Sequence, residues 1–269
     1  MTGRTITSLP SALDPDQLGV WLPTSTQGMP SVFFDYDGTL TPIVERPEQA
    51  ILPSLTRARL RRLSDRCPVT IVTGRDVKVV REFVQLEQLG YAGCHGLDIE
   101  GPVGSGLRYE AAVGLLPVLE EAESDLRYRL AGITGAIVER KRYGISTHYR
   151  LVDPEESVRV DMAVREVSRA HPELRREGGK KVFELRPDVA WDKGAAVVWM
   201  LKKLSRPTAS ATYIGDDETD EHAFNVLAAS GVPIVVAHDD RQTAARYRVR
   251  DPTEVIRVID LLIDALPAS

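Results

Sequence analysis

Cysteine is scarce in this chain, and its scarcity excludes two classes of protein. Only Cys67 and Cys94 occur among 269 residues. Two cysteines cannot form the disulfide framework of a small secreted domain, so we expect free, buried thiols in a reducing cytoplasm. A cysteine-dependent phosphatase normally carries an arginine six residues after its nucleophile, but Thr73 and Glu100 occupy those two positions.

Long apolar runs, an excess of one charge, internal repeats and low-complexity segments are also missing. No apolar run approaches the ~20 residues that cross a bilayer, and the first 21 residues carry acids where a signal peptide has an apolar segment. The 34 basic and 39 acidic residues are well mixed and give a net charge of −5, whereas nucleic-acid-binding proteins usually have a basic face. We therefore expect a cytoplasmic monomer that binds neither membranes nor nucleic acid.

An alternation of strand-like and helix-like segments predicts the fold. From Ser31 onward, short apolar runs rich in β-favouring residues alternate with helical patterns. Such alternation indicates parallel βαβ units and a doubly wound α/β sheet. We expect strands within residues 31–37, 68–74, 89–101, 211–217 and 231–237, and helices within 53–66, 76–89, 192–204, 218–230 and 253–266.

A different pattern interrupts this alternation. It reads as a helix, two strands joined around Arg142–Gly144, a second helix and a further strand, over residues 110–130, 135–150, 153–170 and 180–187. We therefore expect an inserted α+β domain at 109–186 within a parallel-sheet core formed by 31–108 and 187–269. The first ~25 residues lack strong periodicity, so we expect residues 1–30 to form a loose N-terminal arm with one short helix at Pro15–Trp21.

Ligands in open α/β sheets bind at the carboxyl ends of the strands, and two acids end the first strand. Asp35 and Asp37 point to the same side because side chains alternate along an extended chain, while Gly38 allows an abrupt turn. Two carboxylates after a buried strand need a cation or another partner to offset their desolvation and mutual repulsion. The alternative is an acidic β-turn, since Asp and Gly favour turns.

Thr73, Gly74 and Arg75 end the second strand. A hydroxyl and consecutive backbone N–H groups at the start of a helix can hold a phosphate. Thr73 would serve equally well as a residue that caps the following helix.

A lysine and several acids begin the later helices. Lys193 lies in the first turn of a helix, where it opposes the macrodipole, so an anion or carboxylate facing it would explain it better than solvent alone. Asp216 ends an apolar strand and Asp220 follows one helical turn later, so both could give oxygens to a hard cation. Acids in the first turn of a helix also stabilise it by capping, which is the alternative.

The segments DYDGT, TGR, Lys193 and GDDETD, in this order, resemble the four motifs of the haloacid dehalogenase (HAD) superfamily. More narrowly, DYDGTLTPI, AGCHGLDIEG, HYR, KKVFELRP, WDKGAA and YIGDDETDEHAF resemble the trehalose-6-phosphate phosphatase family, over nearly everything from Ser31 to Leu266. The resemblance implies a HAD-like core with an inserted cap domain that sets substrate specificity. It also implies Mg²⁺-dependent hydrolysis of a small sugar phosphate, trehalose 6-phosphate, in trehalose biosynthesis.

The same resemblance implies roles for the acids. Asp35 would be the nucleophile that forms an aspartyl-phosphate, and Asp37 the general acid and then the general base. Asp35, the backbone carbonyl of Asp37 and Asp216 would bind Mg²⁺, whose preferred octahedron water and phosphate would complete. Asp217 and Asp220 would hold the metal-bound waters.

The resemblance further implies the phosphate and sugar contacts. Thr73 and Lys193 would bind the phosphoryl oxygens. Other substrate contacts are expected beside Asp35 and Asp37 in the core and on the predicted strands of the insert: Tyr36, Gly74, Arg75, Lys141, Arg150 and Glu184. Because Arg142, His148 and Lys180 lie in the same polar strands, a solvated strand face with cross-strand ion pairs is the alternative for the insert.

Three other functions stay open on the sequence. The nearest is a phosphatase of the same superfamily that acts on sucrose phosphate or glucosylglycerol phosphate. A phospho-accepting receiver domain also uses Asp, a hydroxyl, Lys and Mg²⁺, but it would lack the spacing of Asp35 and Asp37 and the large insert. A non-catalytic phosphosugar-binding protein would not need a second, protonatable carboxyl.

Overall fold

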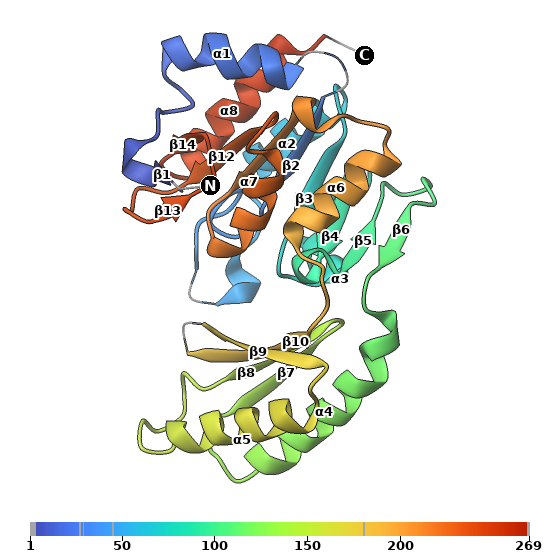
Figure 1. Cartoon of the computed structure of the whole chain (residues 1–269), viewed down its shortest axis with the longest axis vertical. Coiled ribbons are helices and arrows are strands. Elements are labelled where there is room, and N and C mark those ends of the chain that lie inside the picture. Colours follow the sequence, from blue (N-terminus) through green and yellow to red (C-terminus); the bar gives the residue numbers. More distant parts are fainter. Residues whose placement is uncertain (1–3, 27, 29, 45, 180, 268–269) are drawn as a thin grey trace. The chain divides into compact units, whose positions relative to one another are not determined.

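The computed structural model describes residues 4–26, 28, 30–44, 46–179 and 181–267 (Figure 1). The chain divides into two compact units. Residues 1–109 together with 191–269 form the first, here called the core unit, and Glu110–Ala190 form the second, called the inserted unit. The sequence predicts this insert at 109–186.

An eight-stranded sheet in the order β14-β12-β11-β2-β3-β4-β5-β6 forms the centre of the core unit. The strands from β14 to β4 are parallel, and β5 runs antiparallel to β4. This order places β2 between β11 and β3, so the segment after β2 lies near the middle of the carboxyl edge. The bounds are β2 Ser31–Phe34, β3 Val69–Val72, β4 Gly90–Gly93, β5 Asp98–Glu100, β6 Arg108–Glu110, β11 Ala211–Gly215, β12 Val232–Val236 and β14 Tyr247–Val249.

The segment 89–101, which we expected to be one strand, is two. Cys94 and His95 have φ values of 49° and 58°, and Gly96 has a φ of 93°. Three consecutive residues in the left-handed region reverse the chain between β4 and β5. The glycines in the sequence indicated turns here, but they did not indicate that the chain reverses.

Helices cover both faces of the sheet (Figure 1). Because neighbouring strand residues point to opposite faces, Val32 and Phe34 belong to one core cluster and Phe33 to the other. The first cluster includes residues of α1, α2, α3 and α8, and the second includes residues of α6 and α7. The bounds are α1 Pro15–Thr26, α2 Ser54–Ser64, α3 Val77–Val84, α6 Lys193–Lys203, α7 Glu221–Leu227 and α8 Pro252–Ala265.

The N-terminal segment is packed, so the expectation of a loose arm is wrong for its described part. Ile6, Leu9 and Ala12 are buried, and the indole of the buried Trp21 donates to the Ala12 carbonyl at 2.8 Å. The helix α1 continues to Thr26. The apolar residues of this segment follow no helical or strand period, which is why the sequence pattern did not indicate their burial. Residues 1–3, 27 and 29 of the expected arm lie outside the described residues.

The described residues of the inserted unit form two α-helices, a short 3-10 helix at Val113–Leu115 and a four-stranded antiparallel sheet in the order β7-β8-β10-β9. The buried residues of its helices, such as Leu126 and Val164, are spaced at three and four positions, as the sequence predicted. The strand β9 was not predicted, because LRREGG is charged and glycine-rich. The bounds are α4 Leu116–Leu130, β7 Ile137–Lys141, β8 Gly144–His148, α5 Ser157–Ala170, β9 Leu174–Gly179 and β10 Val182–Pro187.

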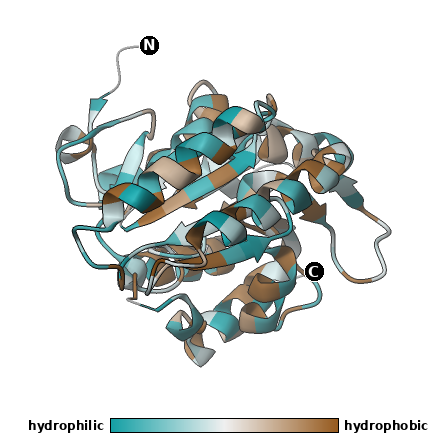
Figure 2. Ribbon diagram, turned by 90° about the horizontal axis from the view of Figure 1, so that it is seen from below, coloured by the Kyte–Doolittle hydropathy of each residue, from teal (hydrophilic) through white to brown (hydrophobic). Residues whose placement is uncertain are grey.

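Hydrophobic residues occur in the strands, and along the helices they alternate with hydrophilic ones (Figure 2). Among the residues that the structure describes, no helix has both the length and the apolar character needed to span a bilayer.

Candidate active site

Asp35 follows β2 at the carboxyl edge of the core sheet. Its backbone N–H donates to the Ile214 carbonyl of the neighbouring β11 at 2.8 Å, which continues the parallel pairing for one more residue. The residue is only 5% exposed. A carboxylate so deeply placed needs charged or polar partners.

Lys193 is the first of these partners. It begins α6, is 2% exposed, and its ammonium donates to Asp35 and to Asp220, each at 2.8 Å. The prediction that carboxylates face this lysine is confirmed. Burial acts to lower the pKa of Lys193, but Asp220 and Asp35 outweigh burial and raise the pKa above its ordinary value, so the side chain stays charged.

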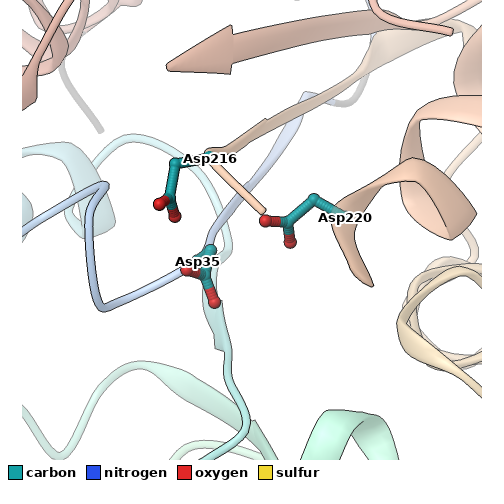
Figure 3. A group of neighbouring side chains, drawn as sticks. All are labelled: Asp35, Asp216 and Asp220. Carbon is teal, nitrogen blue, oxygen red and sulfur yellow. The ribbon is translucent and has the colours of Figure 1, made fainter. Parts of the chain in front are cut away.

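Three carboxylates converge at this edge (Figure 3). Asp35, Asp216 and Asp220 each offer an oxygen, and these oxygens lie within 4.8 Å of one another. Asp220 is fully buried and also accepts from the Tyr213 hydroxyl at 2.5 Å. The structure thus brings Asp35, which follows β2, together with Asp216 and Asp220, which follow the neighbouring β11. Asp37, expected on the same side as Asp35, is not part of this cluster.

The charges in this cluster suit a divalent cation. One lysine cannot neutralise three carboxylates, and the pKa values of Asp35 and Asp216 reflect this mismatch. Burial, followed by the nearby Asp220, raises the pKa of Asp216 to about 6. Burial raises the pKa of Asp35 well above its usual range, and Asp220 and Asp216 add to this against the pull of Lys193. A hard cation with oxygen ligands would remove this uncompensated repulsion.

The close approach of Asp216 requires glycine at position 38. Its φ is +82°, and a Cβ atom at this position would lie 2.1 Å from Oδ2 of Asp216. Thr39, which follows it, is buried and donates to Asp216 Oδ1 at 3.3 Å. The turn after Asp37 therefore approaches Asp216 more closely than any side chain would permit.

Asp37 is held by an arginine rather than by the cluster. The Arg75 guanidinium donates from Nε to Asp37 Oδ2 at 2.7 Å and from Nη2 to Oδ1 at 2.6 Å. The guanidinium also lies over the rings of Phe83, at 5.2 Å, and Tyr36, at 5.6 Å. Two hydrogen bonds and two ring contacts fix the Asp37 carboxylate in one orientation.

Thr73 and Gly74 lie beside this pair at the end of β3. Thr73 is buried, and its hydroxyl accepts from the Arg75 N–H at 3.2 Å. A Cβ atom at Gly74 would lie 2.6 Å from Nε2 of His95, so glycine is required for this close approach. The segment presents a hydroxyl and backbone N–H groups near the carboxyl edge, as a phosphate cradle needs.

The side chain of Tyr36, a residue predicted to contact the substrate, does not face the site. Its ring is fully buried, and its hydroxyl donates to the Ala50 carbonyl at 2.6 Å. Side chains alternate along the extended segment, so the residue between Asp35 and Asp37 points into the core. Only the backbone of Tyr36 can face a ligand.

Asp217 differs from Asp220 although the resemblance implied one role for both. Asp217 is exposed, and its carboxylate accepts from the Glu218 N–H at 2.8 Å as part of a capping box with Asp220. Its own N–H donates to Asp220 Oδ2 at 3.0 Å. Asp217 therefore shapes the turn that holds Asp220 inside the cluster.

Two of the three predicted sugar contacts, Lys141 and Glu184, lie on the sheet of the inserted unit. Lys141 of β7 donates to Glu184 of β10 at 2.6 Å, and Ser146 of β8 donates to the same carboxylate at 2.8 Å. Arg150 lies in the exposed turn after β8, outside the sheet that carries this pair. Lys180 lies outside the described residues.

Tyr213 is the site residue that sequence reasoning missed in the cluster. A tyrosine inside an apolar strand looks like core, yet its hydroxyl reaches Asp220, and burial followed by Asp220 and Asp35 raises its pKa well above its ordinary value. The alternation of strand residues would have placed it on the face that carries α6, which is the one available signal.

Comparison with known proteins shows which family the chain resembles. Residues 33–253 match the trehalose-phosphatase family. A probable trehalose-phosphate phosphatase 3 of Oryza sativa subsp. japonica is 41% identical over 251 residues, covering 86% of this chain and 69% of the relative. A trehalose-phosphate phosphatase of Mycobacterium tuberculosis H37Rv is 40% identical over 265 residues, covering 96% of this chain and 67% of the relative.

Solved structures show the same fold. The C-terminal domain of Candida albicans trehalose-6-phosphate phosphatase has a TM-score of 0.77 at 24% identity, covering 96% of this chain and 100% of that one. A haloacid dehalogenase-like hydrolase from Bacteroides thetaiotaomicron has a TM-score of 0.64 at 15% identity, covering 87% and 99%. The predicted HAD-like architecture is confirmed. With a family match over most of its length and relatives at about 40% identity, the chain belongs to the trehalose-phosphatase family.

Proposed function

We propose that this protein hydrolyses trehalose 6-phosphate to trehalose and inorganic phosphate in a Mg²⁺-dependent reaction. The observation that carries the proposal is the buried Asp35 carboxylate, which Lys193 contacts at 2.8 Å beside two further carboxylates, with Asp37 two residues away. Family membership supports the choice of substrate, because the relatives are named for this reaction.

The first half of the reaction uses both acids of the β2 loop. An Asp35 oxygen attacks the phosphorus, the new O–P bond forms an aspartyl-phosphate, and the bond between phosphorus and the sugar oxygen breaks. Asp37 gives its proton to the departing sugar oxygen. Arg75 holds the Asp37 carboxyl in the orientation that this transfer requires.

The second half reverses the role of Asp37. It accepts a proton from water while the water oxygen attacks the phosphorus, and the bond to Asp35 breaks. Phosphate leaves, Asp35 is restored as a carboxylate, and Asp37 is protonated again. One carboxyl thus serves as acid and base in turn, and this is why a binding protein would not need it.

The remaining residues of the site position the phosphoryl group. Asp35, Asp216 and the Asp37 carbonyl would hold Mg²⁺, with Asp217 and Asp220 around it. When bound, the cation would offset the charge that gathers on the phosphoryl oxygens. Lys193 and Thr73 would contact those oxygens, and the Gly74 N–H would complete the cradle, while the Arg75 N–H donates to the Thr73 hydroxyl and orients it.

The sugar contacts would come from the inserted unit. Lys141 and Glu184 form a hydrogen-bonded pair on its sheet, and charged groups make the stronger hydrogen bonds to hydroxyls. We propose these two as the contacts that distinguish one sugar phosphate from another, with Arg150 as a third.

The test is phosphate release with a panel of trehalose 6-phosphate, sucrose phosphate, glucosylglycerol phosphate and an aryl phosphate, with and without Mg²⁺. Trehalose 6-phosphate is expected to give the highest kcat/KM. Asp35→Asn is expected to abolish release, and Lys193→Ala to lower it by about 10²–10³-fold. Asp260→Asn is the matched control, because Asp260 pairs with Arg59 away from the site. Near-normal turnover by Asp35→Asn would end the proposed mechanism, and preference for another sugar would end the proposed specificity.

Action as a monomer in the cytoplasm is part of the same proposal. Sedimentation of the purified protein and fractionation of the source cells would test these two points.

A further inference from the structure

Arg241 is placed against the acidic cluster although no catalytic step uses it. Its guanidinium Nη2 donates to the backbone carbonyl of Asp216. The residue lies between β12 and β13 (Gln242–Thr243), in the loop after the carboxyl end of β12. Its side chain is 23% exposed. An arginine that is mostly shielded from solvent and bonded to the main chain of a cluster residue acts on geometry rather than on a ligand directly.

The loop that carries Arg241 is itself held by the N-terminal segment. The strand β1 (Arg4–Thr5) pairs antiparallel with β13. The Ile6 N–H donates to the Arg241 carbonyl at 3.0 Å, and the Thr7 hydroxyl donates to Asp240 Oδ1 at 2.6 Å. Ile6 is fully buried in the core cluster on this face. These contacts hold the Arg241 carbonyl and the side chain of the preceding Asp240.

The segment 241–244 also contacts α7, the helix that follows Asp220. The Ala244 N–H donates to Glu221 Oε2 at 2.8 Å, in the first turn of α7. Asp216 and Glu221 flank the turn that carries Asp220. Residues 241–244 therefore hold the chain immediately before and immediately after that turn.

We propose that Arg241, fixed by residues 4–7, is a positioning residue that sets the place of Asp216 in the acidic cluster. Carboxylates that repel one another separate unless their backbone is restrained. A restrained backbone lowers the cost of bringing them onto one cation, as groups behind metal ligands do generally. The inference rests on the proposed Mg²⁺ dependence, and its test keeps the two apart.

Isothermal titration of Mg²⁺ alone into the full chain measures the effect without turnover. Arg241→Ala is expected to weaken Mg²⁺ binding by roughly 10-fold, at the low end of the range for such supporting residues. The matched control is Arg246→Ala, because Arg246 also donates to a backbone carbonyl, that of Gly231, before the amino end of β12. The control is expected to bind Mg²⁺ like the unaltered protein.

Amide hydrogen exchange of the metal-free protein gives a second measurement. Exchange over residues 215–221 is expected to be faster in Arg241→Ala than in the control. Thr7→Val removes only the bond to Asp240 and is expected to shift both measurements in the same direction by less, so it serves if Arg241→Ala does not fold.

The two proposals can fail independently. If the unaltered protein binds Mg²⁺, and Arg241→Ala and Thr7→Val bind it equally well with unchanged exchange, the positioning role is wrong and the proposed function is untouched. If the unaltered protein binds no Mg²⁺, the proposed metal dependence fails. Unchanged exchange in both variants would then overturn the positioning role as well.

Discussion

Replacing Arg75 by lysine would separate protonation of the leaving group from the other steps of turnover. In the structure, Arg75 makes two hydrogen bonds to Asp37, at 2.7 and 2.6 Å, and lies over the Phe83 ring at 5.2 Å. Lysine keeps the charge but has no planar fork, so at most one of the two bonds survives.

The size of the effect follows from that single lost bond. A hydrogen bond between charged groups contributes about 1.5–3 kcal/mol, and about 1.4 kcal/mol corresponds to a tenfold change in rate. We expect kcat on trehalose 6-phosphate to fall by about 10- to 100-fold because Asp37 no longer points reliably at the sugar oxygen. An aryl phosphate with an acidic phenol as leaving group needs little proton transfer, so its kcat should fall by about threefold or less.

The assay compares the two substrates at saturating Mg²⁺, with Arg81→Lys as the control. Arg81 lies in α3, where its guanidinium covers the Tyr91 ring at 4.6 Å and pairs with Glu100 at 3.1 Å. Equal losses on both substrates would refute the reasoning. A raised KM with unchanged kcat would show instead that Arg75 binds the substrate.

Three further results are expected. First, Glu254 accepts from the Arg250 side chain at 2.7 Å, and although burial opposes it, this contact lowers the pKa of Glu254. The stability that this contact contributes is present above the unfolded pKa and is lost as pH falls through the lower folded pKa. Glu254→Gln should therefore lower the free energy of unfolding by about 1 kcal/mol at pH 7 and by progressively less as the solution is acidified. A difference that stays constant with pH would contradict this. Second, burial raises the pKa of Cys67 to about 12, and both thiols are buried, so a thiol reagent should react with the native protein far more slowly than with the unfolded chain. Third, Glu184→Ala should raise KM for trehalose 6-phosphate while an aryl phosphate reacts normally, whereas Glu166→Ala, on a helix of the same unit, should change neither; unchanged sugar-phosphate kinetics in Glu184→Ala would remove the proposed sugar contact.

The parts of the fold that the sequence predicted are those with one dominant physical signal. The run at Ser31–Phe34 is buried at every position, as an inner parallel strand must be, and its continuous apolar sequence indicated this. Lys193 at a helix N-terminus is unfavourable without a partner, and this conflict pointed to the carboxylates that it contacts.

The parts that were missed depend on tertiary contacts that leave no local pattern. The charged strand Leu174–Gly179 is stabilised by pairing with β10 rather than by apolar alternation. Ile6 and Trp21 are buried, but the apolar residues of the N-terminal segment do not follow a helical or strand spacing that would reveal this. The hydroxyl of Tyr213 and the guanidinium of Arg241 reach the cluster from positions that look like ordinary core and loop. Sequence spacing places residues on one edge, but it does not show which side chains from other elements support them.

The most direct test of the central claim is a rapid acid quench of the enzyme during turnover of trehalose 6-phosphate labelled with ³²P. The mechanism predicts protein-bound label that hydroxylamine releases and that maps to the peptide containing Asp35. Label should be absent from Asp35→Asn and present in Asp260→Asn. Rapid phosphate release with no label on the protein, or label that persists in Asp35→Asn, would contradict the account.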